Sequence, residues 1–404
     1  MDLVKILSPK SFRIIFVGLC LMVLIAGCQT ETPEAPMEEI ATATEIPATE
    51  PPQATATPQG ETIMQIQGPG HISPYRNQMV TNVEGIVIVV RSNGFYMQSI
   101  NPDEDPATSE GIFVVTDFVP SARVGDQVTV DGRVEEMTPG GGYGNLSTTQ
   151  IDDPEVTILS SGNDLPAPTI IGEGGRIPPT EIIDDDTEGF ISESTNFDPQ
   201  NDGLDFYESL EGMLVQVNDA VVVGPTNAYK EIAVLPDQGA RAGVITPRGG
   251  IVIRPEDFNP ERIILDDLLV ETPFVKVADR ATAPIIGVMD YDFGNFKLLP
   301  TESPQFTDGG LEPEAGLTEA ESGQLRVVSY NVLNLSAQQP QRMAQLADQI
   351  VNKLGSPDII GLQEIMDNDG SEGQEAVSAD QTYQGIVDAI VDLGGPQYGF
   401  VDID

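Results

Sequence analysis

The stretch SPDIIGLQEIMDND, residues 356–369, ends a run of buried-strand residues on two polar side chains. The segment from Asp358 to Leu362 has the apolar, β-branched character of a short central strand, and Gln363 and Glu364 follow at its carboxyl end. A carboxylate in this place is either a surface residue that ends the strand or a residue that performs chemistry. The flanking sequence helps to distinguish these two interpretations.

A strand, an amphipathic helix and a second strand are predicted around this stretch. The sequence LRVVSYNVLNL, residues 325–335, is an apolar-rich strand that delivers Asn331. Apolar residues then recur at helical spacing over residues 343–354, and Pro340 suits the first turn of that helix. The helical crossover makes the two strands parallel, so their carboxyl ends lie at the same edge of the sheet. We therefore expect Asn331 to lie beside Glu364.

Asn331 and Glu364 are the residues that we predict to be catalytic and to hold a metal ion. Ligand sites collect at the carboxyl ends of parallel strands. A neutral oxygen donor beside a carboxylate suits magnesium, which needs only one or two protein carboxylates and takes its other ligands from water and phosphate. On residue types alone, the alternative is a polar strand end without chemistry.

The two strand ends resemble the first two motifs of the endonuclease/exonuclease/phosphatase superfamily, the pancreatic-deoxyribonuclease-like fold. SYNVLNL, residues 329–335, is similar to its first motif, and IIGLQEI, residues 359–365, is similar to its second. The resemblance implies an α/β sandwich and hydrolysis of a phosphodiester with magnesium, for which manganese can substitute. It also implies that Asn331 lies at the metal and the scissile phosphate, and that Glu364 ligates the metal.

The resemblance covers only the first part of such a catalytic domain, residues 324–404. The later motifs of the superfamily, which supply two histidines and further Asp and Asn residues, cannot be matched. We therefore expect a C-terminally truncated fragment with negligible nuclease activity of its own. Within this part, Ser378 and Gln381 are predicted to form a capping box at the start of a second helix.

The middle of the chain is predicted to be β-rich. Runs of β-branched residues separated by turns indicate a small barrel or sandwich over residues 61–171 and a second β-rich domain over residues 172–306, followed by an acidic linker, residues 307–323. The order of the first set resembles the OB-like module that precedes the catalytic domain of secreted bacterial nucleases, which implies a nucleic-acid substrate, DNA in the first instance. The predicted fold class is therefore multidomain: an OB-like barrel and a second β domain, followed by an incomplete α/β sandwich.

Aromatic residues and one histidine in this β-rich part have two interpretations each. Aromatic side chains on OB folds can stack on single-stranded nucleic acid, but few cations lie near these, so packing or scaffolding is the favoured role. The aromatic residues are Phe95, Tyr96, Phe113 and Phe118. His71, in a Gly/Pro-rich turn, is the one histidine of the chain and is predicted to be structural.

An acidic loop, NFDPQNDGLDFYE at residues 196–208, resembles a calcium-binding loop in part. It spaces Asp198, Asp202 and Asp205 as ligands, but Glu208 is one position short of the bidentate glutamate that an EF-hand requires. The alternatives are a calcium site and a solvated acidic loop without a metal, and the second is favoured.

The N-terminal residues predict export and lipid anchoring. A basic start and the apolar run IIFVGLCLMVLIA suit a signal peptide over residues 1–27, and the following IAGC resembles a bacterial lipoprotein signal in which Cys28 is lipidated. Residues 28–60, which are dominated by Thr, Pro, Glu and Ala, are predicted to be a disordered linker. The protein is therefore expected in the cell envelope, facing the extracytoplasmic side, or secreted.

The formal net charge of −45 limits the function classes that the chain can serve. It argues against nucleic-acid binding through a broad basic surface, but not against a local cationic or metal-centred site. Two other functions remain open on the sequence. One is a non-catalytic envelope lipoprotein whose β domains bind a polymer or partner, and the other is a phosphatase of the same superfamily. No particular protein partner is predicted.

Overall fold

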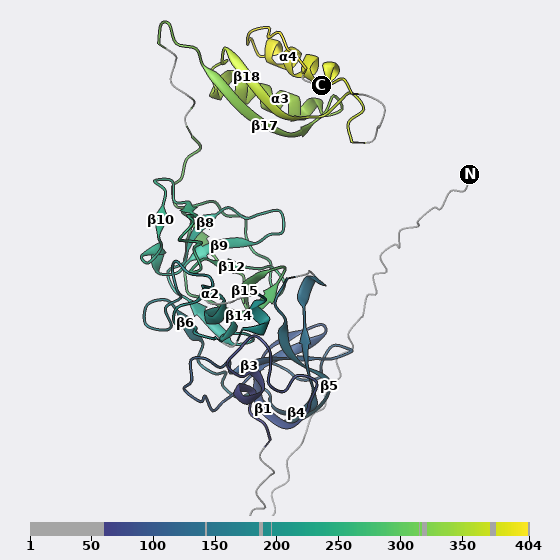
Figure 1. Ribbon diagram of the computed structural model, residues 1–404, viewed down its shortest axis with the longest axis vertical. Helices are drawn as coiled ribbons and strands as arrows, with labels where there is room; N and C mark the ends of the chain where they lie inside the picture. The colour runs from purple at the N-terminus through teal and green to yellow at the C-terminus, as the bar shows by residue number, and fades with distance from the viewer. Residues whose placement is uncertain are drawn as a thin grey trace, which may run out of the picture. The chain divides into compact units, whose positions relative to one another are not determined.

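The structure, a computed structural model, describes residues 60–141, 144–185, 189–194, 196–314, 316, 321–371 and 377–402. The predicted signal peptide, the lipidation site Cys28 and the predicted linker up to residue 59 lie outside these residues. Strands dominate the described parts and helices are few (Figure 1), so the predicted β-rich organisation with several sheets is confirmed.

The first sheet closes into a barrel in the order β1-β2-β3-β5-β4. Strand β3 pairs with β5 in parallel, and the other neighbours pair antiparallel. The short helix α1 (Ile63–Gln67) precedes the barrel and begins with a capping box at Thr62. The strands are β1 (Met79–Arg91), β2 (Gly94–Gln98), β3 (Gly111–Val115), β4 (Gln127–Met137) and β5 (Thr148–Ser160).

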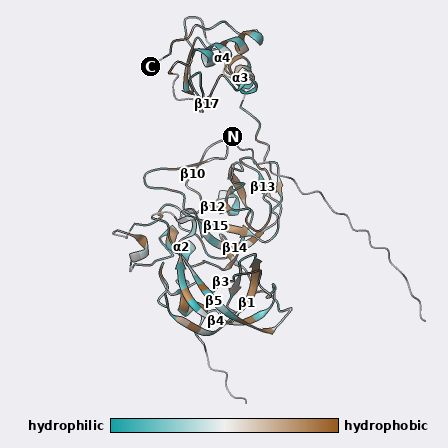
Figure 2. Ribbon diagram, turned by 90° about the vertical axis from the view of Figure 1, so that its right-hand side faces the viewer, coloured by the Kyte–Doolittle hydropathy of each residue, from teal (hydrophilic) through white to brown (hydrophobic). Residues whose placement is uncertain are grey.

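Alternation of side chains along the strands fills the barrel. Val128, Val130 and Val134 of β4 are fully buried, while Thr129, Asp131 and Arg133 are more exposed. Hydrophobic and hydrophilic residues accordingly mix along β4 (Figure 2). The pairing register with β5 shifts between Asp131 and Arg133, on either side of Gly132. A Cβ at this glycine would lie 2.4 Å from the Ile151 side chain, so the strand can bend here only because the residue is glycine.

The second sheet has nine strands in the order β16-β13-β8-β9-β12-β15-β14-β7-β6. Strand β6 pairs in parallel with β7, so this sheet begins at Thr169, before the predicted domain boundary at residue 172. It ends with β16 at Thr307, inside the segment predicted as acidic linker, because β16 pairs with β13. Strand pairing over long sequence distances, which local periodicity does not show, sets both limits.

The elements of this second region are mostly short. Helix α2 (Gly203–Glu208) lies between β6 and β7, and β10 (Val244–Ile245) pairs with β11 (Ile251–Val252) as a separate hairpin. The strands of the sheet are β6 (Thr169–Ile171), β7 (Leu214–Val217), β8 (Val221–Gly224), β9 (Ile232–Leu235), β12 (Ile263–Leu265), β13 (Arg280–Ala281), β14 (Ile285–Asp292), β15 (Asn295–Pro300) and β16 (Phe306–Thr307). Single turns of 3₁₀-helix are η1 (Pro139–Gly141), η2 (Ile191–Glu193) and η3 (Asp237–Gly239).

The barrel and the second sheet share an apolar contact. Tyr96 of the barrel is buried there with Leu214 and Leu299 of the second sheet, and Phe113 packs against the same cluster. Phe95 lies in the barrel core. Three of the four aromatic residues considered for nucleic-acid contact are therefore used in packing, as the favoured interpretation expected, and Phe118 is exposed.

Two glycines allow the backbones to approach at this contact. A Cβ on Gly111 of β3 would lie 2.2 Å from the carbonyl carbon of Gly212, and Gly212 itself has a φ of +70°. Side chains then tie the two parts together. The Leu214 N–H donates to the Gln98 amide oxygen over 2.9 Å, and the Ser109 hydroxyl donates to the Glu211 carbonyl oxygen.

The C-terminal part has the predicted strand–helix–strand order. Strand β17 (Val327–Leu335) and strand β18 (Ile359–Ile365) pair in parallel. Between them, α3 (Pro340–Asp348) begins at the expected proline and continues into one π-helical turn, η4 (Gln349–Lys353). Helix α4 (Asp380–Asp392) follows β18. Both α-helices lie on one side of the strand pair (Figure 1) and share its apolar core.

One detail of this part was predicted wrongly. No capping box forms at the start of α4, because its N-cap is Ala379 and Ser378 stands one residue too early. The Ser378 hydroxyl donates instead to the Asp380 carboxylate.

Among the described residues, β17 and β18 pair with each other and with no further strand, so the α/β sandwich stays a prediction.

No helix in the part of the chain that the structure describes is both long enough and apolar enough to cross a membrane.

The shared contact predicts joint stability of the barrel and the second sheet. Leu299→Ala should lower the free energy of unfolding by about 2–5 kcal/mol, because it leaves a cavity where both parts pack. Leu268→Ala, at a side chain 52% exposed, is the matched control and should change it by less than about 0.5 kcal/mol. Urea unfolding followed by circular dichroism measures both. Two separate transitions in the wild type would contradict a shared core.

Candidate metal centre

The carboxyl ends of β17 and β18 lie side by side. The parallel register pairs Tyr330 with Leu362 and Asn331 with Gln363, which places Asn331 next to Glu364. Val332 and Leu335 of β17 are buried in the core shared with the helices, whereas Asn331, Gln363 and Glu364 are exposed. The structure thus brings together the two residues that the sequence predicts for one site.

A direct hydrogen bond joins these two side chains. The Asn331 Nδ2 donates to Glu364 Oε1 over 2.6 Å, and both residues are exposed. The Asn331 Oδ1 accepts from the backbone N–H of Leu333 over 2.8 Å, which fixes the orientation of the amide. Next to them, Gln363 Nε2 donates to Ser329 Oγ over 2.9 Å. Glu364 is therefore held in place by its neighbour while it stays open to solvent.

The backbone around this pair is strained. Leu333, Asn334 and Glu364 have φ values of +54°, +53° and +59°, in the left-handed region that non-glycine residues seldom adopt. The pairing register also shifts between Asn331 and Leu335. Each such conformation costs about 1–3 kcal/mol, and such conformations are common at functional sites, where they fix the direction of a side chain. Of the two predicted site residues, Glu364 itself has this backbone conformation, and Leu333 and Asn334 follow Asn331 in the chain.

The donor set fits a magnesium ion. Glu364 offers carboxylate oxygens in an exposed position, and magnesium binds one or two carboxylates while it keeps several waters. Asn331 has one further N–H and one further oxygen lone pair beyond the bonds described above. In this arrangement Glu364 is the residue that would hold a metal, and Asn331 orients the Glu364 carboxylate. Direct ligation by Asn331 stays a prediction.

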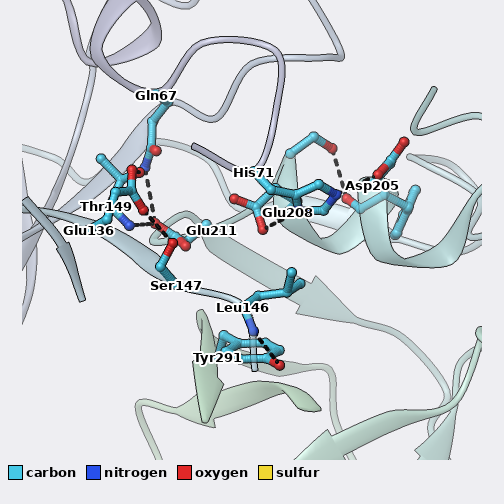
Figure 3. A network of polar contacts seen from close by, with 12 residues as sticks. Gln67, His71, Glu136, Leu146, Ser147, Thr149, Asp205, Glu208, Glu211 and Tyr291 are labelled. Atoms are coloured by element: carbon cyan, nitrogen blue, oxygen red, sulfur yellow. Dashed lines mark hydrogen bonds and ion pairs between the residues drawn. The ribbon is translucent and has the colours of Figure 1, made fainter. Parts of the chain in front are cut away.

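A second polar site lies buried where the barrel meets the second region (Figure 3). His71 Nε2 lies 2.7 Å from Asp205 Oδ1, and His71 Nδ1 lies 3.1 Å from Glu208 Oε2. His71 is 4% exposed, and both carboxylates come from α2. Burial alone lowers the pKa of His71, but hydrogen bonds to the two carboxylates and their charges outweigh it and raise the pKa to about 9. His71 is therefore a cation at neutral pH, with both ring nitrogens engaged.

A buried glutamate extends this network. Glu211 Oε1 accepts from the Thr149 N–H over 2.9 Å and from Gln67 Nε2 over 3.4 Å (Figure 3). Burial, and after it the charges of Glu208 and Glu136, raise the pKa of Glu211 well above its ordinary value. The Glu211 carboxyl group joins the barrel to the second region through these hydrogen bonds.

The acidic loop is not the solvated loop that the sequence favours, because Asp202, Asp205 and Glu208 are only 1%, 4% and 6% exposed. Ligand oxygens of Asp198, Asp202 and Asp205 lie within 4.8 Å of one another. Asp205 Oδ1 contacts His71, and its Oδ2 accepts from the Asp198 N–H over 2.7 Å. Glu208, the residue expected at the end of a calcium loop, contacts His71 as well. The calcium site stays a prediction.

Sequence reasoning found the β17–β18 pair but missed the partners of His71. Asp205 and Glu208 lie 134 and 137 residues away along the chain, and no local pattern connects them to it. The sequence has a single histidine and 64 acidic residues, so a carboxylate partner for this histidine could have been expected. The sequence does not show which carboxylate it is.

Comparisons with known proteins give limited information. A family model described as Domain of unknown function (DUF8508) matches residues 170–308, which agrees with the second sheet from β6 to β16. No curated protein matches the chain. Among solved structures, the crystal structure of wild-type single-stranded DNA binding protein from Thermus aquaticus is similar at 9% identity, over 62% of this chain and 99% of that chain, with a TM-score of 0.17. A TM-score this low carries no argument about fold or function.

The charge of His71 predicts a pH-dependent stability. The folded-state pKa of about 9 lies above the ordinary 6.5, so the stabilisation is complete below 6.5 and is lost as the pH rises through 9. The difference in free energy of unfolding between wild type and His71→Gln should shrink by about 3 kcal/mol between about pH 6 and about pH 10. Urea titrations across this range measure it.

Arg248→Gln is the control for this measurement. It removes an ion pair with Glu314 in which the side chains are 46% and 75% exposed. Its effect should be small and constant over the same pH range, because arginine stays charged there. A His71→Gln difference that is equally constant with pH would contradict a buried imidazolium.

Proposed function

We propose that residues 325–402 contribute the metal-holding part of a phosphodiester hydrolase site, with nucleic acid, DNA in the first instance, as substrate. The observation that carries this proposal is the 2.6 Å contact between Asn331 Nδ2 and Glu364 Oε1 at the carboxyl ends of two parallel strands. It supports the functional interpretation of the motifs SYNVLNL and IIGLQEI over the alternative of a plain strand end. The proposal includes an α/β sandwich of the deoxyribonuclease-like kind around this pair.

The β-rich region also supports this proposal. Its first barrel has the strand order β1-β2-β3-β5-β4, with a parallel β3–β5 pair, which is the arrangement that an OB-like module requires. The sequence of this region resembles the module that precedes the catalytic domain of secreted nucleases. A lipid anchor at Cys28 and an extracytoplasmic location belong to the same proposal.

The residues of the site have distinct roles in the proposed reaction. Glu364 binds the metal ion, and a magnesium ion bound there would stabilise negative charge on the phosphate. Asn331 holds the Glu364 carboxylate by one N–H and offers its second N–H to a phosphate oxygen. His71 cannot serve as the base that activates water, because both of its ring nitrogens contact buried carboxylates.

A metal centre also reconciles the charge of the protein with a polyanionic substrate. The formal net charge of −45 repels nucleic acid at long range, but salt at about 0.1 M screens charges beyond about 10 Å. Local attraction at a divalent cation then decides whether a phosphate is bound. This predicts that substrate binding depends on the metal more than on the overall charge.

Metal binding tests this proposal directly. Titration calorimetry with magnesium, or electron paramagnetic resonance with manganese, should detect a site in the wild-type chain that Glu364→Gln abolishes. Asn331→Ala should weaken binding about 10–100-fold, since it removes the group that orients the ligand. Asp392→Asn, at an exposed acid of α4, is the matched control and should bind as the wild type does.

Two results would contradict the assignment. One is magnesium binding that is the same in Glu364→Gln as in the wild type. The other is magnesium-dependent cleavage of DNA by the purified chain that persists in Glu364→Gln. Circular dichroism of each variant confirms that the strand pair is still folded, which the exposure of both side chains leads us to expect.

A further inference from the structure

A cavity of about 530 Å³ lies away from the metal centre, between β12, β14 and β15 of the second sheet and residues 144–146 of the barrel segment. The Leu146 N–H donates to the Tyr291 hydroxyl over 3.1 Å, which holds that segment against β14. The volume is in the range of sites that bind small ligands or one unit of a polymer. Neither the metal centre nor the His71 network contributes a residue to it.

The charge of this cavity differs from that of the chain. Acidic residues number 64 of 404, yet none of the described residues that line this cavity is Asp or Glu, and Arg262 lies in its wall. By contrast, Asp266, Asp290 and Asp292 line a neighbouring cavity of about 560 Å³. Burial raises the pKa of Glu261, which adjoins Arg262, to about 7, so much of that carboxyl group is uncharged at neutral pH. The cavity is therefore suited to an anionic ligand.

Aromatic and amide groups supply the rest of the wall. The Phe258 side chain is 52% exposed and presents a flat apolar surface. Asn259 and Tyr207 also line the cavity, are 3% and 6% exposed, and have an amide and a hydroxyl group without hydrogen-bond partners.

We infer that this cavity binds one nucleotide unit of a single-stranded nucleic acid. The base stacks on Phe258, and Arg262 pairs with the adjoining phosphate. A base has the flat face for the ring, and its phosphate accounts for Arg262, the one cation among the described residues of the wall, none of which is Asp or Glu. A neutral saccharide would also stack on Phe258 but would gain nothing from the charge of Arg262. This site is separate from the metal centre and does not depend on hydrolysis there.

The test is binding of a single-stranded DNA oligonucleotide that contains 2-aminopurine, followed by its fluorescence. The chain has no tryptophan, so the probe is read without interference, and a chelator keeps the metal centre out of the measurement. Phe258→Ala should weaken binding about tenfold through the loss of one stacked base. Arg262→Gln should weaken it and lower the slope of log affinity against log salt concentration by about one.

Matched controls come from the same region. Phe274→Ala removes a ring that is 86% exposed, and Arg254→Gln removes an exposed cation, and neither residue lines this cavity. Both should bind as the wild type does, and so should Glu364→Gln, which separates this site from the proposed hydrolase. The inference is overturned if the wild type does not bind the oligonucleotide, if Phe258→Ala and Arg262→Gln bind unchanged, if the controls lose as much, or if a neutral oligosaccharide displaces the DNA.

Discussion

The contact of His71 with Asp205 and Glu208 is the interaction on which the β-rich part depends. A very acidic chain must bury carboxylates where the barrel meets the second region, and an isolated buried charge is too costly to keep. The protein solves this in two ways within one network. It places its single histidine, as a cation, between two carboxylates, and burial raises the pKa of Glu211, whose carboxylate oxygen accepts from the Thr149 N–H. The apolar contact around Tyr96 and Leu299 lies at the same junction of the barrel and the second sheet.

A different constraint produces the proposed metal centre. Parallel pairing through a helical crossover forces the carboxyl ends of β17 and β18 to one edge, whatever side chains they carry. The sequence places an amide and a carboxylate at those ends, and left-handed backbone at Leu333, Asn334 and Glu364 turns the chain where they meet. The charge of Glu364 is left exposed, in contrast to the buried carboxylates around His71. Exposure suits a group that is to bind a hydrated ion and a substrate.

The two proposed sites divide the recognition of a polyanion between them. The overall charge of −45 argues against a broad basic groove, so attraction is expected at points where the local charge differs from the average. The metal ion proposed at Glu364 would be one such point, and Arg262, in a wall whose described residues include no Asp or Glu, is another. Of the barrel aromatics considered for stacking, Phe95 packs in the barrel core, Tyr96 and Phe113 pack at the contact with the second sheet, and Phe118 stays exposed. Phe258 is a further exposed ring, in the second region.

The sequence by itself determined the β-rich character and the meeting of Asn331 with Glu364. Each of these follows from local periodicity or from the geometry of one crossover, and both depend on residues that are close together in the chain. Only the tertiary structure decided that β6 belongs to the second sheet, that His71 is held as a cation, and that the described residues around Arg262 in the cavity wall include no Asp or Glu. These depend on pairings between residues far apart in the chain, whose energies come from burial and mutual charge. Local sequence patterns do not predict which distant segment contacts a given residue.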